Sequence, residues 1–160
     1  MILPEELRGI EFLENLGAEH LNRIAMMARL EEHLEGTILF QEGQPAPFIY
    51  FVLSGTVGLE VTEPDGEAVE VCTVGPGELL GWSPVLGGRA MTATARTQTR
   101  CRMAVLDVKQ VQELCERQPQ FGVAFLRQVA LVLSERLHGT RRCLALARSV
   151  STRSLLGTVS

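Results

Sequence analysis

The chain has 160 residues, of which 46% are hydrophobic and 21% are charged, and its net charge is −4. These proportions are ordinary for one soluble globular domain, and a chain of this length can bury a core without disulfides or metals. No apolar run approaches the roughly 18 residues that a membrane-spanning helix needs, and the start lacks the basic region and apolar run of a secretion signal. We therefore expect a cytoplasmic protein with no membrane partner.

The charge is distributed unevenly along the chain. Residues 134–160 contain five arginines and one acidic residue, whereas residues 1–133 contain ten basic and eighteen acidic residues. An acidic body with a basic end is a modest indication of an interaction surface near the C-terminus. Arginines exposed on a helix would give the same pattern.

Short helices are expected in residues 1–32. Apolar residues recur there at helical spacing in two runs, and Gly17 between them favours a helix stop. The two runs consist of Leu7, Ile10, Leu13 and Leu16, and of Leu21, Ile24, Ala25 and Ala28.

Residues 33–107 have the pattern of an all-β domain. Short runs rich in β-branched and aromatic residues are separated by turn residues about every 8–12 positions, which favours a barrel or a sandwich. Apolar residues alternate with other residues over Val57–Thr62. The sequence EPDGE at 63–67 predicts a hairpin with Asp65 and Gly66 at its tip.

After Asp107 the pattern becomes helical over residues 108–150. A short amphipathic helix is predicted to end near Pro119, and a long helix follows over about residues 120–149. Apolar positions on the long helix recur with the 3.5-residue period of a coiled coil. This heptad seam consists of Leu126, Ala130, Leu133, Leu137, Thr140, Leu144 and Ala147.

The long helix has a second apolar stripe on another face, which could pack on the β-domain. The stripe consists of Phe121, Phe125, Val129 and Val132. A helix of this length spans roughly 45 Å, more than a 160-residue domain readily covers. We therefore expect the heptad seam to form a homodimer with a second copy of the chain. Burial of the whole helix within one monomer is the alternative.

The cysteines and histidines indicate neither a metal site nor a disulfide framework. Four cysteines lie at wide spacings without a C-x-x-C motif, and they are interpreted as small buried hydrophobic residues. A redox or haem-ligand role for one of them is the alternative. The three histidines lie far apart, and no Ser/His/Asp constellation or close carboxylate pair is present, so we do not expect an enzyme. The cysteines are Cys72, Cys101, Cys115 and Cys143, and the histidines are His20, His33 and His138.

The order of these elements and three segments of the chain resemble a known family. The segments are LFQEGQPAPFIYFVLSGTVGLEV, GPGELLGWSPVLGG and MTATARTQTRCRMAVLD. They resemble the cyclic-nucleotide-binding sensor domain of Crp–Fnr type bacterial transcription regulators, over about residues 10–150. The resemblance implies a mainly β fold, a double-stranded β-helix or jelly-roll barrel, with short N-terminal helices and a long C-terminal dimerisation helix. It also implies turn glycines at Gly43 and Gly55.

The segment GPGELLGWSPVLGG corresponds to the family's phosphate-binding cassette. The resemblance implies a short helix after Gly81, whose first N–H groups, from Trp82 and Ser83, would point toward an anion. In ligand-binding members the residue after this glycine is a glutamate that binds the ribose, and nine residues later an arginine pairs with the cyclic phosphate. The corresponding residues here are Trp82 and Met91. The small residue that follows, Thr92, fits the family.

Both charged determinants are therefore absent from this chain. A hydrogen bond to a charged group contributes about 1.5–3 kcal/mol, so losing two weakens cyclic AMP binding by roughly 10²- to 10⁴-fold. We predict that cyclic AMP does not bind in the usual pose. Arg89, two residues before Met91, is an alternative phosphate partner, and a solvated loop arginine is the plainer interpretation.

Two hypotheses remain for the pocket. Trp82, Met91, Val85 and Leu86 would give it an apolar wall that suits an apolar or flat aromatic effector. Alternatively, Trp82 and Met91 fill the cavity, and the chain is a dimerisation or scaffold domain without a ligand. Neither haem nor an iron–sulfur cluster is expected as a cofactor, because no histidine is an obvious partner for Cys72 and the family's N-terminal cysteine set is missing.

Residues 151–160 resemble the beginning of the helix-turn-helix domain that follows in the family. Ser149 or Ser151 would be its N-cap. Too few residues follow to form a recognition helix, so DNA is expected as a partner only if a helix-turn-helix domain is present in the full gene product. We interpret the chain as a regulatory, ligand-sensing domain, either truncated or stand-alone.

Overall fold

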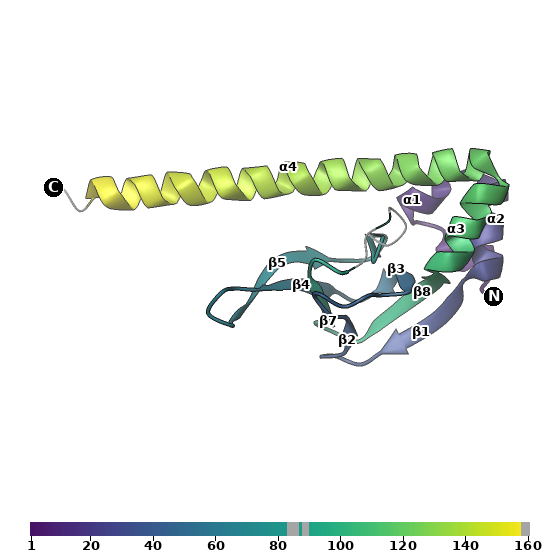
Figure 1. The fold of residues 1–160 in the computed structure, drawn as a ribbon, viewed down its shortest axis with the longest axis horizontal. Helices are drawn as coiled ribbons and strands as arrows, with labels where there is room; N and C mark the ends of the chain where they lie inside the picture. Colours follow the sequence, from purple (N-terminus) through teal and green to yellow (C-terminus); the bar gives the residue numbers. More distant parts are fainter. Residues whose placement is uncertain (83–86, 88–89, 158–160) are drawn as a thin grey trace. The chain divides into compact units, whose positions relative to one another are not determined.

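Figure 1 shows the fold in a computed structural model. The structure describes residues 1–82, 87 and 90–157, and for 151–157 it describes the backbone alone. The chain divides into two units, Met1–Ala124 and Phe125–Ser160. The first unit holds the N-terminal helices, both sheets and α3, and the second consists of most of the long helix.

The N-terminal segment contains a 3-10 turn and two helices. These are η1 (Pro4–Leu7), α1 (Glu11–Glu14) and α2 (Ala18–Met27). Gly17, which has a φ of +90°, separates α1 from α2 at the position where the sequence predicts a helix stop. The first strand begins at Arg29, earlier than the expected start of the β-domain near His33. Its polar sequence RLEEH gives no local strand signal, and pairing with the last strand determines its conformation.

Eight strands in the described part of the chain form two antiparallel four-stranded sheets. The strands are β1 (Arg29–His33), β2 (Ile38–Phe40), β3 (Phe48–Ser54), β4 (Val57–Thr62), β5 (Ala68–Val74), β6 (Leu79–Leu80), β7 (Thr94–Thr97) and β8 (Cys101–Asp107). One sheet has the order β1-β8-β3-β6 and the other has the order β2-β7-β4-β5. Because neighbouring strands are distant in sequence in every pair except β4–β5, the chain winds between the sheets as a jelly roll does, which confirms the predicted fold.

The space between the two sheets is filled by apolar side chains from both of them. This barrel core contains Phe40, Ala46, Tyr50, Val52, Val57, Val74, Leu80, Met91, Ala95, Cys101, Met103 and Val105. Alternate residues of β3, Ile49 and Phe51, are also fully buried and lie on the opposite face of that strand. The ring of Phe51 lies 5.4 Å from that of Phe12 in α1, so the N-terminal segment covers this second face.

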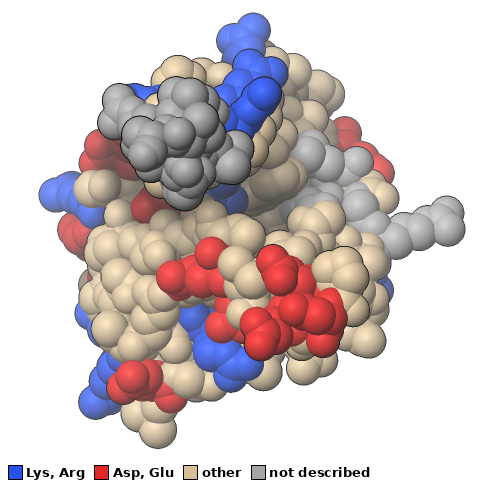
Figure 2. All heavy atoms as spheres, turned by 90° about the vertical axis from the view of Figure 1, so that its left-hand side faces the viewer, with Lys and Arg blue, Asp and Glu red and all other residues tan. Residues whose placement is uncertain are grey.

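The predicted turns are confirmed. The β4–β5 hairpin closes at residues 63–67, where the amide of Glu63 donates to the carbonyl of Glu67 at 2.8 Å and Gly66 has a φ of +90°. Gly43 and Gly55 also have positive φ. The hairpin is acidic and exposed from residue 62 to residue 70, and Figure 2 shows acidic side chains gathered on the face at this end of the molecule.

Two helices follow the last strand. Helix α3 (Val108–Arg117) begins with Asp107 as its N-cap, which accepts a hydrogen bond from the amide of Lys109 at 2.8 Å. Helix α4 (Pro119–Gly157) continues through Ser149 and Ser151, where we expected the N-cap of a new helix. The predicted helix end near residue 149 was therefore wrong. The helix continues because no glycine or proline interrupts it between Gly139 and Gly157. None of the described helices combines the length and the apolar character that crossing a membrane requires.

The second apolar stripe of the long helix is largely buried. Phe121, Phe125 and Val129 are at most 1% exposed, and Val132 is half-buried. Within the first unit, the ring of Phe121 meets that of His20 edge-on, with their centroids 5.4 Å apart. The stripe therefore belongs to a buried surface, as its spacing predicts.

Candidate ligand-binding site

Gly81 begins the segment that resembles the phosphate-binding cassette. Strand β6 leads directly into this segment. Gly81 has a φ of +81°, a conformation that only glycine adopts readily. A Cβ atom at this position would lie 2.5 Å from the carbonyl oxygen of Phe48. The conformation and the close approach of the β3 backbone both require glycine here.

The other cassette candidates are described only in part. Trp82 is half-buried and Thr92 is exposed. Ser83 and Arg89 lie outside the described residues, as does the short helix expected after Gly81. The expected anion contacts of this loop therefore stay predictions.

Met91, at the position of the family's phosphate-binding arginine, is part of the barrel core. Its exposed fraction is 7%, and its neighbours in the core are apolar side chains of both sheets. Its backbone is held on both sides: its carbonyl accepts from the amide of Gly43 at 2.8 Å, and its own amide donates to the carbonyl of Gln44 at 3.0 Å. The residue that should face a phosphate is thus an apolar side chain within an apolar core.

Tyr50 supplies a polar group to the same core. Its hydroxyl donates to the carbonyl of Leu39 at 3.5 Å, a long hydrogen bond. Burial raises the pKa of the Tyr50 phenol above its ordinary value, and the carboxylate of Glu31 raises it further. Because these surroundings disfavour a negative charge, they suit an apolar or neutral group better than a phosphate.

Glu42 fixes the backbone around Met91, and the sequence gives no signal of this role. Its amide donates to the hydroxyl of Thr94 at 3.0 Å, and its carboxylate accepts from the amide of Thr62 at 2.9 Å. These contacts join the end of β2 to β7 and to β4. Since the partners lie far apart in sequence, no local pattern could have revealed them.

The residues of the heptad seam are exposed in the single chain, except Leu133, which is half-buried. Leu126 is 42% exposed, Leu137 is 51% exposed and Leu144 is 61% exposed. The hydroxyl of Thr140 donates to the carbonyl of Arg136 at 2.9 Å, so the one polar member has a partner within its own helix. Ala130 and Ala147 complete this exposed row.

The cysteines differ in exposure. Cys101 is buried, with its thiol near the carbonyl oxygens of Thr56 at 3.4 Å and Thr99 at 3.3 Å. Cys72 and Cys115 are half-buried, and burial raises the pKa of the Cys115 thiol. Cys143 is exposed on α4, so its interpretation as a buried residue was wrong. No group of three or more His, Cys, Asp or Glu residues in the described ranges is arranged to hold a metal ion.

Comparison with known proteins identifies the family. The model of the cyclic nucleotide-binding domain matches residues 30–118. The CRP-like cAMP-activated global transcriptional regulator of Mycobacterium tuberculosis is 28% identical, over 69% of this chain and 47% of its own length. The chain thus spans about half the length of this curated relative.

Two solved structures have the same fold. The N-terminal domain of a transcriptional regulator from Streptomyces coelicolor is 29% identical, with a TM-score of 0.68 over 81% of this chain and 93% of that one. A cyclic nucleotide-binding domain from Methylobacillus flagellatus is 18% identical, with a TM-score of 0.78 over 89% of this chain and 82% of that one. The family match, the jelly-roll topology and the placement of Gly81 agree, and the chain belongs to the cyclic nucleotide-binding domain family.

Proposed function

We propose that the chain is the ligand-sensing regulatory domain of a CRP-like transcriptional regulator and that its cassette does not bind cyclic AMP in the usual pose. The observation that carries the proposal is the burial of Met91, 7% exposed in an apolar core, at the cassette's arginine position. A phosphate placed there would lose its hydration without gaining a cationic partner. Trp82 likewise replaces the carboxylate that would bind the sugar.

The effector that these residues favour is an apolar or flat aromatic molecule. Met91 supplies an apolar wall, and Trp82, half-buried at the start of the cassette, supplies an aromatic one. Ligand pockets of this kind combine an apolar lining with few polar groups. The phenol of Tyr50, with one long hydrogen bond to Leu39, is a polar group that could orient such a molecule.

The proposed regulator works as a homodimer through the heptad seam. A row of leucines that are 42–61% exposed in the single chain supports this, because a second copy would remove that apolar surface from water. DNA is a partner only when a helix-turn-helix domain is present in the full gene product. We propose a cytoplasmic location and no enzymatic activity.

A second candidate function is a dimerisation or scaffold domain whose pocket is filled by its own side chains. The packing of Met91 against the barrel core favours it as well. The two candidates differ in ligand response, since a sensing domain gains stability from its effector and a filled pocket does not. Melting temperatures measured across a set of apolar and aromatic molecules distinguish them.

Calorimetric titration with cyclic AMP tests the central claim, with the molecular mass in solution measured on the same sample. We expect no heat of binding up to millimolar cyclic AMP and the mass of a dimer. Micromolar binding would overturn the cassette assignment and would mean that Arg89 or backbone amides replace the missing arginine. A monomeric mass would overturn only the proposed role of the seam in dimerisation and would leave the cassette assignment unchanged.

A further inference from the structure

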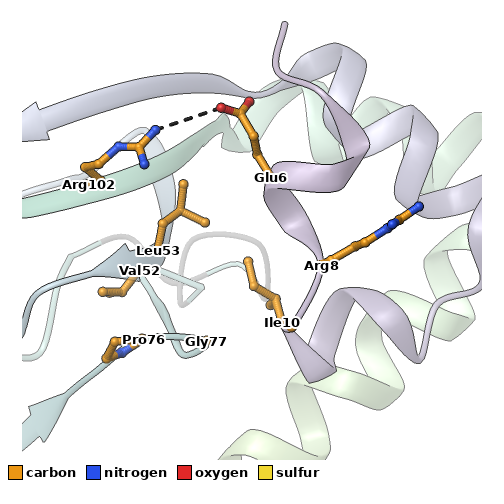
Figure 3. A pocket seen from close by; sticks show the side chains of 9 residues that line it. Glu6, Arg8, Ile10, Val52, Leu53, Pro76, Gly77 and Arg102 are labelled. Carbon is orange, nitrogen blue, oxygen red and sulfur yellow. Dashed lines mark ion pairs between the residues drawn. The ribbon is translucent and has the colours of Figure 1, made fainter.

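A pocket with a volume of about 290 Å³ lies where the N-terminal segment meets β3 and β8. Glu6 and Ile10 line it from the N-terminal side, and Leu53 and Arg102 line it from the strands. Figure 3 shows the side chains of Ile10 and Leu53 between these two walls, whereas that of Arg8 points away. The turn at Pro76 and Gly77 closes one side. None of these residues is one of the cassette candidates, so the pocket is a separate site.

Arg102 forms two long ion pairs at this pocket, and Figure 3 shows the one with Glu6. Its guanidinium lies 3.9 Å from the carboxylate of Glu6 and 3.6 Å from that of Glu32, and both distances exceed that of a hydrogen bond. The Arg102 side chain is 45% exposed. Its planar set of five N–H donors is suited to a carboxylate that can approach more closely.

Both acidic neighbours of Arg102 are held by shorter contacts elsewhere. Glu6 accepts a hydrogen bond from the amide of Leu3 at 3.1 Å, within the 3-10 turn. Glu32 accepts from the guanidinium of Arg100 at 2.8 Å, which lowers the pKa of the Glu32 carboxyl. In both residues the other carboxylate oxygen faces Arg102, and it does so only at the longer ion-pair distance.

The rest of the pocket is apolar or has its backbone groups paired. Ile10, Val52, Leu53 and Pro76 offer hydrocarbon surface. The amide of Gly77 donates to the carbonyl of Val52 at 2.8 Å, so this backbone donor is already satisfied. The pocket therefore combines an apolar surface with the ion pair of Arg102 and Glu6, whose distance leaves room for a closer carboxylate on Arg102.

We propose that this pocket binds a small monocarboxylate with an apolar body, with the carboxylate on Arg102 and the body against Ile10 and Leu53. Its volume lies just below the usual range for ligand pockets and corresponds to about ten non-hydrogen atoms. The Pro76–Gly77 turn precedes β6 and Gly81 directly in the chain, so a ligand here contacts the segment that leads into the cassette.

Titration of the isotope-labelled protein with octanoate, followed by NMR of the backbone amides, tests the proposal. We expect saturable shifts at Gly9 and Gly77, and no such shifts with octylamine, which has the opposite charge. Arg102→Gln should weaken octanoate binding by about 10- to 100-fold, because a charge-assisted hydrogen bond is lost. The matched control is Arg96→Gln, which removes an arginine that is 43% exposed and paired with Glu60 in the other sheet, and it should leave binding unchanged.

A second variant keeps the test decisive if Arg102→Gln does not fold. Glu6→Gln retains an acceptor for the Leu3 amide but removes the negative charge beside Arg102, so octanoate should bind about two- to fivefold more tightly. Equal binding of octanoate by the wild type and by Arg102→Gln overturns the proposal. So does equal or weaker binding by Glu6→Gln, and so do shifts confined to the exposed leucines of α4.

Discussion

The backbone of Phe48 passes so close to Gly81 that a Cβ atom there would lie 2.5 Å from the Phe48 carbonyl oxygen. Contact with a backbone atom cannot be relieved by a side-chain rotation, so β3 or the start of the cassette would have to shift. The positive φ of Gly81 adds a conformational cost. This single contact therefore fixes where the cassette begins relative to the sheet.

Replacement of Gly81 by alanine should destabilise the protein by about 2–4 kcal/mol, as measured by urea unfolding. The matched control is Gly36→Ala, because Gly36 has a similar φ of +83° but nothing within 4 Å of its Cβ position. That variant should lose only about 1–2 kcal/mol, the cost of the backbone conformation. Equal losses in the two variants would mean that the chain relieves the contact with Phe48 at little cost.

Met91→Arg tests whether the position of the family's phosphate-binding arginine lies in a packed core or in an open cavity. In a filled core, a buried charge without a partner should cost about 2–4 kcal/mol of stability, whereas Met91→Leu should cost less than about 1.5 kcal/mol. An arginine variant as stable as the wild type would instead indicate a hydrated cavity.

Restoration of both family determinants extends this test to binding. If Trp82→Glu with Met91→Arg folds, it should bind cyclic AMP roughly 10²- to 10⁴-fold more tightly than the wild type. Calorimetry gives the ratio, and either single variant is the control. No gain in a folded double variant would show that the shape of the pocket, and not only its charge, excludes the nucleotide.

The heptad seam predicts a specific pair of disruptive substitutions. Leu133→Asp with Leu137→Asp should convert the expected dimer to a monomer, because two charges per helix would be buried at the interface. The control is Leu131→Asp with Leu146→Asp, since these leucines are 54% and 66% exposed but lie off the seam. Sedimentation or light scattering gives the mass, and a dimer that survives in the seam variant contradicts the assignment.

The raised pKa of Tyr50 predicts how stability changes at high pH. The phenol is neutral in both states below the unfolded pKa of about 10. As pH rises from that value through the higher folded pKa, ionisation favours the unfolded state, so the free energy of unfolding should fall over this window. Tyr50→Phe should lose less stability over the same window, since every other titrating group is shared.

The titration of Tyr50 can also be followed directly. It is the only tyrosine in the chain, so the ultraviolet absorbance of tyrosinate reports this one group. The folded protein should titrate above pH 10, and the denatured protein near pH 10. Coinciding midpoints would mean that the phenol is hydrated in the folded state.

The strands that the sequence predicts well are those in which local pattern and tertiary environment agree. In β4 the alternate residues Val57 and Leu59 belong to or pack against the barrel core, and Asp65 and Gly66 form the tip of the next turn, so alternation and turn chemistry reveal both. The sequence RLEEH of β1 has no such pattern, because its partner β8 is about 70 residues away in the chain. Contacts between residues so far apart in the chain produce no local pattern in the sequence.

Some residues of the candidate site could likewise be predicted from the sequence, and others could not. Gly81 could be predicted from the family resemblance, and its positive φ and the close approach of the Phe48 backbone explain why glycine is required there. The anchoring role of Glu42 could not, since an exposed-looking glutamate gives no indication of hydrogen bonds to Thr62 and Thr94. The family pattern suggested only that Met91 could fill the cavity. Which side chains surround Met91 could be learned only from the folded structure.

Trp82 is the only tryptophan in the chain and lies half-buried directly after Gly81. The intrinsic fluorescence of the protein therefore comes from a single indole at the start of the cassette. Its emission wavelength and its quenching by added iodide report how far this loop is open to water, without any label. A titrant that enters the barrel should alter that emission, whereas one that binds beside Arg102 should act on it only through the turn at Gly77.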